Sequence, residues 1–541
     1  MKRIGKGALA LVLSASLALV SACSNANAPA NEPSAEAPAA GGAKSVTVGV
    51  TYAPSNINPL APVGLVSTYV ASLLFPPLVD LDSDLQYKPM LADSIETSDN
   101  KTFTIKLNEK AAWTDGKPVT ADDVIFTLGL MTNPKVASNL AYLFAIIEGL
   151  DDAGFLPEGQ TAISGVKKVD ERTLTVTVKA PTTLSIFQDT IGKNLLTLPQ
   201  SALADIAPEE LAKSDFMQKP DVTSGPFKLA EYNRDQFVRL EANDAYFKGA
   251  PKLDSLNFKV LQGNAVTAQL QSGEIDMNIP SAGVIPVGDY EKVKGLQGIR
   301  TVEAAPLATQ FMYINEAVVP DAKQRQAISY AMNRQQIVDK LLHGAGEVVD
   351  SYFTSYSPYR DESVQPAAYD PEKAKSLLAE SGWDSAKTLR LYVLSGDATL
   401  EQAANIVAEN LRAAGVQTKI QMMDLATLID NLVKMDYDLG ILTVSLTPIN
   451  PLPDIAYFLK EGNPSGYKNA EAEKLLDAIA AETDEAKIKQ SYSDLQKIIA
   501  QDVPMPAIYA TKALGAVSER VSGAEPKDFG MFINVYEWDV K

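Results

Sequence analysis

Cysteine and histidine occur once each in this 541-residue chain, as Cys23 and His343. A single cysteine cannot form a disulfide within the chain, and one cysteine with one histidine cannot build a structural zinc site. A Ser-His-Asp triad would have to use His343. That histidine directly precedes Gly344 at the end of a helical pattern, where its side chain suits a helix C-terminus. This inventory favours binding over catalysis.

Carboxylates are plentiful, with 67 Asp and Glu against 48 Lys and Arg and a net charge of −19. Two paired carboxylates could hydrolyse glycosides, but no recognisable motif pairs candidate acids in this sequence. The acidity argues against nucleic acid as a partner, because that binding depends on basic contacts to phosphate. The excess charge is explained by solubility. We expect no catalytic residue, no metal site and no cofactor.

The residues that precede Cys23 indicate where the protein is located. Lys2, Arg3 and Lys6 precede an apolar run over residues 7–20, which is the order of a secretion signal and is too short for a stable membrane span. With Cys23 at its end, the segment resembles a bacterial lipoprotein signal, whose cysteine is acylated and begins the mature chain. A buried thiol beside a plain cleavage site is the alternative. We expect a signal peptide over 1–22, lipid attachment at Cys23, and a position on the extracytoplasmic face of the membrane.

Residues 24–44 contain almost nothing large and apolar. Such a stretch cannot bury enough surface to offset its ordering entropy, so a flexible tether is expected over 23–44. One acyl chain anchors only marginally, and stable attachment at Cys23 therefore implies more than one. No later segment approaches a membrane-spanning length of apolar residues. The body, 45–541, is long enough for more than one hydrophobic core.

The pattern of the body changes halfway along the chain. Alternating apolar residues predict strands at 46–50, 102–107 and 172–178, set among turn residues. Later, helices are predicted at 321–342, 371–382 and 487–501, and one that ends at Gly415 precedes a strand at 417–420. Helices that alternate with short strands indicate an α/β protein, with a sheet-rich first half.

Residues 102–128 read TFTIKLNEKAAWTDGKPVTADDVIFTL. They predict a strand, a tight turn at Asp115-Gly116, and a helix capped by Thr120 with acidic residues in its first turn. This stretch closely resembles family 5 of the solute-binding proteins of ABC importers, the dipeptide- and oligopeptide-binding lipoproteins. Further landmarks of the family follow in order at 169–173, 224–229, 243–247, 272–276, 325–334, 369–374 and 466–469.

The resemblance implies a two-lobed, periplasmic-binding-protein-like α/β fold with a hinge and a cleft, and an extra sheet-rich domain on the first lobe. Lobe I would comprise 45–82, 216–302 and 505–541, the extra domain 83–215, and lobe III 303–504. Ligand would stabilise the closed state by contacting both sides of the cleft.

The resemblance also implies a function. The protein would be a monomeric receptor, not an enzyme, that captures peptides and delivers them to a membrane permease served by separate ATPase subunits. Sensing of peptide signals would use the same closure. An oligosaccharide or a nickel chelate held by one histidine is the alternative cargo.

Peptide-binding members of the family hold the peptide amino group with an aspartate, in a loop after a strand that begins Gly-Trp. Here Val444 stands near the tryptophan position, and no acid lies between Ser445 and Pro453. The resemblance then leaves Asp454 as the nearest carboxylate and Asn450 as a polar stand-in. Asp454 could instead cap a helix before Ile455. If neither residue serves, the ligand would lack a free amino terminus.

Other cleft residues are expected from loops at strand ends, where Tyr and Asn provide adaptable hydrogen bonding. The candidates are Asn56 and Asn58 after the first strand, and Tyr313 and Asn315 at the entry to lobe III. Each also has a structural interpretation.

Overall fold

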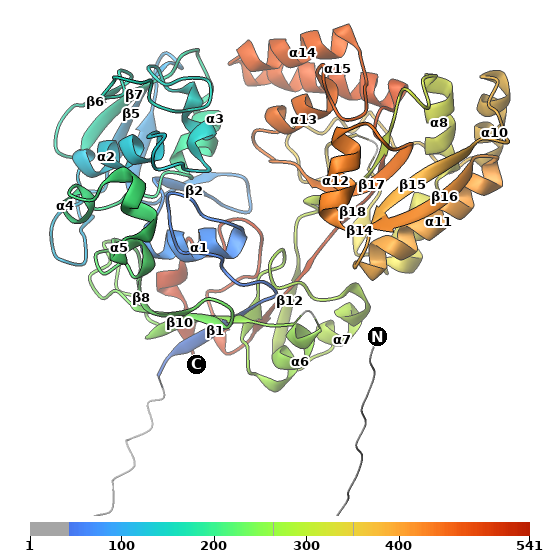
Figure 1. Ribbon diagram of the computed structural model, residues 1–541. Coiled ribbons are helices and arrows are strands. Elements are labelled where there is room, and N and C mark those ends of the chain that lie inside the picture. Colours follow the sequence, from blue (N-terminus) through green and yellow to red (C-terminus); the bar gives the residue numbers. More distant parts are fainter. Residues whose placement is uncertain (1–42, 263, 350) are drawn as a thin grey trace, which may run out of the picture. The chain divides into compact units, whose positions relative to one another are not determined.

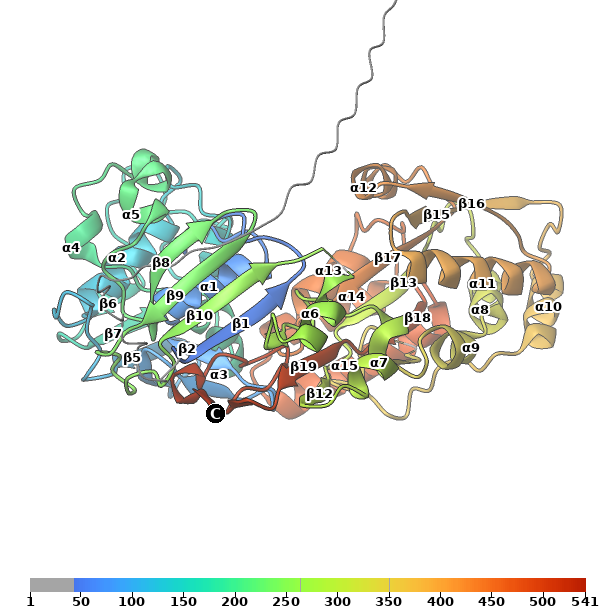
Figure 2. The same ribbon diagram turned by 90° about the horizontal axis from the view of Figure 1, so that it is seen from below.

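Three large β-sheets frame the described chain, which in this computed structural model comprises residues 43–541 except 263 and 350. The predicted signal peptide over 1–22, Cys23 and most of the tether lie outside the described residues. Figure 1 shows the sheets and the helices that cover them, and Figure 2 shows them from below. We call the bodies built on the seven-stranded and six-stranded sheets lobe I and lobe III, and the body built on the four-stranded sheet the extra domain.

The seven-stranded sheet contains the first described strand, whose Val46, Val48 and Val50 are all fully buried. That strand, β1, pairs in parallel with β10 and β11, and the other pairs are antiparallel. The order is β12 (Ile299–Glu303), β19 (Leu514–Ser518), β11 (Met277–Asn278), β1 (Ser45–Val50), β10 (Ser255–Val260), β9 (Phe237–Ala242) and β8 (Phe227–Asn233). Helical segments of this lobe are α1 (Leu65–Leu74), α6 (Ala265–Ser272), η4 (Val287–Asp289), α7 (Tyr290–Lys294) and η6 (Val535–Glu537), and a small pair is β20 (Val521–Ser522) with β21 (Asp539–Val540).

The four-stranded sheet of the extra domain carries the sequence that identified the family. Its strands run in the order β4 (Ala92–Glu96), β5 (Thr102–Leu107), β7 (Thr173–Thr177), β6 (Val166–Lys168), and the hairpin β2 (Val79–Leu81) and β3 (Tyr87–Pro89) precedes it. The predicted turn is present, with Gly116 at a φ of 86°. Thr120 caps α2 (Ala121–Met131) as predicted, and Asp123 completes a capping box with it. The remaining helical segments are η1 (Ala141–Ile146), α3 (Leu184–Phe187), η2 (Gln188–Gly192), α4 (Gln200–Leu203), η3 (Pro208–Lys213) and α5 (Asp215–Gln218).

The six-stranded sheet of lobe III is covered on both faces. Met312 and Ile314 pack into a core with α8, α10 and α11, whereas Phe311 and Tyr313 pack into one with α13, α14 and α15. The strand order is β14 (Gly346–Glu347), β18 (Ala507–Thr511), β13 (Ala308–Ile314), β17 (Leu439–Ser445), β15 (Thr388–Leu394) and β16 (Gln417–Met423). The helices are α8 (Ala322–Ala331), α9 (Arg334–Gln336), η5 (Ile337–Leu341), α10 (Pro371–Glu380), α11 (Ala398–Ala414), α12 (Leu425–Val433), α13 (Leu452–Leu459), α14 (Ala470–Ala481) and α15 (Glu485–Asp502).

The chain crosses between these two sheets twice. The first crossing joins β12 to β13, and the second joins β18 to β19. The crossings touch, because the backbone N–H of Ala304 donates to the carbonyl of Ala513 at 2.8 Å. The Tyr290 hydroxyl bridges the second crossing, donating to the carbonyl of Lys512 at 3.2 Å and accepting from the N–H of Leu514 at 3.1 Å. Two adjacent chain segments that join two lobes form the structural basis of a hinge between them.

Two expectations need correction. The helix predicted over 321–342 is interrupted, because the Asn333 side chain caps a new turn by accepting from the N–H of Gln336 at 3.1 Å. The lobe boundary predicted at residue 505 falls before β18, which pairs with β13, so the chain returns to the first sheet only between Thr511 and Leu514. The other domain boundaries stay predictions. Asp370 capping α10 and Gly415 ending α11 in the left-handed conformation are confirmed.

Candidate functional site

Asp454 occupies the first turn of α13, directly after the loop that follows β17. The N-cap position is taken by Pro451, so the predicted helix-capping role of Asp454 is wrong. The carboxylate instead accepts from the backbone N–H of Thr447 at 3.1 Å, which closes the loop onto the helix. Burial raises the pKa of this half-buried carboxyl group, and the charge of Asp189 adds to the rise. A group of this kind would gain from a cationic partner.

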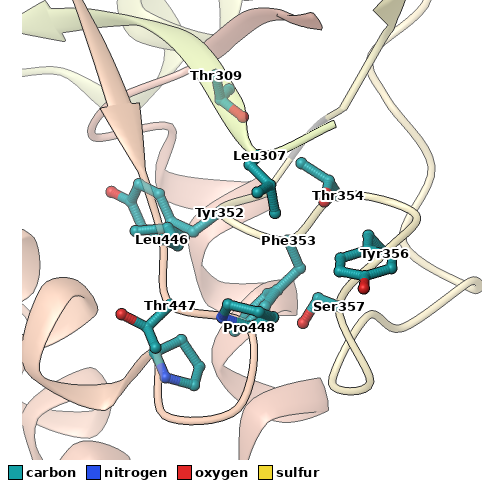
Figure 3. A pocket seen from close by; sticks show the side chains of 11 residues that line it. Leu307, Thr309, Tyr352, Phe353, Thr354, Tyr356, Ser357, Leu446, Thr447 and Pro448 are labelled. Carbon is teal, nitrogen blue, oxygen red and sulfur yellow. The ribbon is translucent and has the colours of Figure 1, made fainter. Parts of the chain in front are cut away.

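A small pocket adjoins this loop (Figure 3). The picture shows it between one segment that carries Thr354, Tyr356 and Ser357 and another that carries Leu446, Thr447 and Pro448. Its volume is about 20 Å³ in this arrangement, which is space for about one water molecule. The full lining is Leu307, Thr309, Tyr352, Phe353, Thr354, Tyr356, Ser357, Leu446, Thr447, Pro448 and Pro451. Asn450 is half-buried in the same loop, next to Pro451.

The extra domain contributes a second charged group to this region. Asp189, on η2, is buried and accepts from the Tyr87 hydroxyl at 2.8 Å and from Lys193 Nζ at 2.5 Å. Its charge acts on Asp454 and also on Tyr359, whose pKa is raised to about 12 mainly by burial, with Glu485 and Asp189 adding to the rise. The Tyr359 hydroxyl in turn donates to the carbonyl of Ile449, beside Asn450, at 3.2 Å. Groups from both sides of the cleft therefore act on one another here.

Tyr87, Asp189 and Tyr359 were missed by the reasoning from sequence. The spacing of Asp189 and Lys193 does predict an ion pair within a helical turn. Nothing in the spacing indicates that Tyr87 or Tyr359 would join them, since the contacts are long-range. The site therefore contains a predicted half, around Asp454, and a half that only the fold reveals.

Asn56 and Asn58 hold the loop between β1 and α1. Asn56 accepts from the N–H of Asn58 at 3.2 Å and donates to the carbonyl of Ala61 at 3.0 Å. Asn58 accepts from the N–H of Leu60 at 2.9 Å. These bonds are local and fix the turn, so both side chains stabilise the loop. Their roles toward ligand stay predictions.

Tyr313 and Asn315 are buried within lobe III. The Tyr313 ring meets Phe458 edge-on, with centroids 6.1 Å apart. Asn315 donates from Nδ2 to the carbonyls of Met435 at 3.0 Å and Tyr437 at 2.8 Å. The structure thus places both residues in the core beneath the site, away from Asn56 and Asn58, and their roles toward ligand also stay predictions.

The described residues contain neither a membrane-spanning helix nor a cluster of metal-ligating side chains. Within 43–541, apart from residues 263 and 350, no helix has the length and apolar character needed to cross a bilayer. Over the same residues, no group of three or more His, Cys, Asp or Glu side chains is arranged to hold a metal ion.

Comparison with known proteins gives a consistent answer. The oligopeptide-binding protein AppA of Bacillus subtilis is 28% identical over 554 aligned positions, covering 98% of this chain and 97% of AppA. The solved structure of that protein with a nonapeptide matches with a TM-score of 0.71 at 26% identity, covering 92% of this chain and 99% of the other. The substrate-binding protein CtaP of Listeria monocytogenes matches with a TM-score of 0.79 at 27% identity and the same coverage.

Two sheet-based lobes joined by paired crossings are the architecture of a two-lobed binding protein. The particular family follows from the sequence itself. The chain belongs to the bacterial extracellular solute-binding proteins, family 5, whose model of the middle region matches residues 86–466. It is therefore a substrate-binding protein of an ABC transporter and not an enzyme.

Proposed function

We propose that this protein captures peptides with a free amino terminus and delivers them to a membrane permease with separate ATPase subunits, while a lipid on Cys23 keeps it at the membrane. The names of its relatives support a peptide as cargo, since AppA is an oligopeptide-binding protein crystallised with a nonapeptide. The single observation that carries the amino-terminal preference is the half-buried Asp454 carboxylate beside the pocket.

The geometry around Asp454 supports this role. Within the described residues, Thr447 alone hydrogen-bonds to the carboxylate, through its backbone N–H at 3.1 Å and through its side chain. A carboxylate can accept about four bonds, so capacity is left for an ammonium group. Burial disfavours the free charge, and a cation in the site would relieve that cost. Asn450, in the same loop, offers an amide for the peptide backbone.

The first experiment measures cargo. A chain that begins at residue 24 would be screened by thermal shift and calorimetry against di- to nonapeptides, oligosaccharides and nickel chelates. We expect peptides to raise the melting temperature, because a ligand that binds only the folded state stabilises it. Stabilisation by sugars or chelates and not by peptides would remove the peptide proposal.

The second experiment tests Asp454. Asp454→Ala should weaken binding of a free-amine peptide by about 100-fold, as expected for loss of one partner of a partly buried charged pair. The same peptide with an acetylated terminus should bind wild type and variant alike. Asn450→Ala is the matched variant in the same loop and should cost less than about 10-fold. Equal losses for the free and acetylated peptides would refute the role of Asp454.

The third experiment tests attachment. In cells, Cys23→Ser should move the protein from the membrane fraction to the soluble fraction and abolish incorporation of a labelled fatty acid. A variant that stays in the membrane fraction would show that Cys23 is not the anchor.

A further inference from the structure

A short segment of lobe III, residues 351–361, crosses toward lobe I, and we call it the strap. Its ends and its middle are fixed to lobe III, and at the near end the Ser351 hydroxyl donates to the side-chain oxygen of Gln496 at 3.2 Å. Ser355 donates from its backbone N–H and its hydroxyl to Glu347, at 2.7 and 2.5 Å. At the far end, the Gln496 side chain donates to the carbonyl of Tyr359 at 2.9 Å and accepts from the N–H of Asp361 at 3.1 Å. The strap therefore moves with lobe III.

From this fixed strap, Tyr356 reaches both the extra domain and lobe I. Its hydroxyl donates to the backbone carbonyl of Ser83, in the turn between β2 and β3, at 2.6 Å. Its ring stacks on Phe529, with centroids 6.1 Å apart and planes 4° from parallel. The two contacts join residues 273 and 173 positions apart in the chain, which are brought together only by the arrangement of the lobes.

The surface that receives Tyr356 is itself held in place. The Asp82 carboxylate accepts from the N–H groups of Asp84 and Gln86, both at 2.9 Å, and so pins the turn that presents the carbonyl of Ser83. Lys527, two residues before Phe529, donates to the Ser83 hydroxyl at 3.3 Å. The turn and the segment that carries Phe529 thus form one receiving surface where the extra domain meets lobe I.

The same strap forms one wall of the pocket beside the Asp454 loop. Tyr352, Phe353, Thr354, Tyr356 and Ser357 all line it (Figure 3). A ligand group that enters this pocket therefore touches the segment that also carries the contact to lobe I. Contacts on a shared rigid segment are a direct route by which occupancy of a site can bias the position of a lobe.

We propose that Tyr356 is an interlobe latch, which stabilises the present arrangement of the lobes against a wider one through the carbonyl of Ser83 and the ring of Phe529 and slows the release of ligand from the pocket. These contacts form only when the strap is against lobe I, so they favour that arrangement over any wider one. The effect on ligand release rests on the proposed function, whereas the effect on the lobes does not.

The lobe arrangement can be measured without ligand. Because Cys23 is the single cysteine, full-length Cys23→Ser protein with Asp152→Cys and Lys474→Cys carries one fluorophore on the extra domain and one on lobe III for single-molecule energy transfer. Tyr356→Ala should shift molecules to lower transfer efficiency and raise the ratio of open to closed forms about 10-fold, since it loses a hydrogen bond and a ring contact. Tyr356→Phe, which keeps the ring, should raise the ratio about 3-fold.

Two further variants serve as controls for the specificity of the Tyr356 contact. Tyr369→Ala removes an exposed tyrosine of the same lobe and should leave the distribution unchanged. Phe529→Ala combined with Tyr356→Ala should have less effect than the sum of the two single changes, because both remove the same contact. Identical distributions for Tyr356→Ala, Tyr356→Phe and the parent protein would overturn the latch.

The ligand arm uses a free-amine nonapeptide and stopped-flow release. Its dissociation rate should rise about 10-fold in Tyr356→Ala and about 3-fold in Tyr356→Phe. A shifted distribution with unchanged release would overturn the effect on the pocket. A shifted distribution in a protein that binds no peptide would leave the latch standing and remove the proposed function.

Discussion

Two aspartates of this protein occupy the same position in a helix and have very different surroundings. Asp123 is the third residue of α2, and Asp454 is the third residue of α13. The Asp123 carboxylate is buried and accepts from Thr120, from the N–H of Gln200 and from Trp113. The Asp454 carboxylate is half-buried, accepts from Thr447 and lies within reach of the charge of Asp189.

The difference separates a structural carboxylate from a candidate for binding. An acid whose bonds are all made by its own fold is held for stability, as most buried polar groups are. An acid that is partly buried, has spare acceptor capacity and has a raised pKa gains from a ligand that brings positive charge. The helix position is the same, so the surroundings and not the local sequence decide the role.

The largest effect that tests this contrast is on stability. Asp123→Ala should lower the free energy of unfolding by about 3 kcal/mol, because the N–H groups of Thr120 and Gln200 would lose their acceptor inside the extra domain. Urea unfolding measures the loss. Asp122→Ala, which removes an exposed acid next to it, should cost under about 1 kcal/mol. Similar losses for the two variants would show that Asp123 is not structural.

Local features of the fold were predictable because they depend on neighbouring residues. The capping box at Thr120, the start of α10 at Asp370-Pro371 and the end of α11 at Gly415 all follow from side chains within three or four positions. The prediction of one helix over 321–342 was wrong for the same kind of reason, because Asn333 caps a new helical turn and does not continue the first helix. The apolar periodicity continues across that break and concealed it.

The site was only half predictable. Resemblance to the family located Asp454, but Tyr87 meets Asp189 across 102 positions and Tyr356 meets Ser83 across 273. Contacts of that separation are set by tertiary packing, within the extra domain for Tyr87 and between lobe III and the rest of the molecule for Tyr356, and this leaves no periodic trace in the sequence. Tyr313 and Asn315, which the sequence places at the entry to lobe III, are buried, and the pattern did not indicate that burial.

A third carboxylate sharpens the contrast with an intermediate effect. Burial raises the pKa of Asp528 from its ordinary 3.8 to about 6, and a hydrogen bond from Ser281 opposes the rise only in part. Because the folded pKa is the higher one, the contribution of Asp528 to stability is fully present below about pH 3.8 and is lost as the pH rises through 6. Asp528→Asn should therefore be more stable than wild type at pH 7, by about 2 kcal/mol. The two should converge near pH 3.5 when unfolding is followed at each pH, and a constant difference would contradict this.

The smallest effect on stability is expected for Asp454→Asn, which should raise stability and lower the affinity for peptide. Burial raises the pKa of this carboxyl group, so its charge costs stability at neutral pH. Asp454→Asn keeps an acceptor for the N–H of Thr447 and removes the charge, and it should raise the free energy of unfolding at pH 7 by under about 1 kcal/mol, since the group is partly exposed to solvent. That gain should shrink as the pH falls below the ordinary pKa of an aspartate, because the carboxyl group then becomes neutral in both the folded and the unfolded protein.

The same variant should bind free-amine peptides more weakly, which calorimetry at pH 7 measures. Higher stability with lower affinity is the signature of a residue retained for its ligand and not for its fold. Asp123→Asn provides the matched control at the equivalent helix position. It should lower stability, because the Asn Nδ2 cannot accept the bond that one Asp123 oxygen takes from Gln200 or from Thr120, and it should leave affinity unchanged. Loss of stability in both variants would place Asp454 with the structural acids.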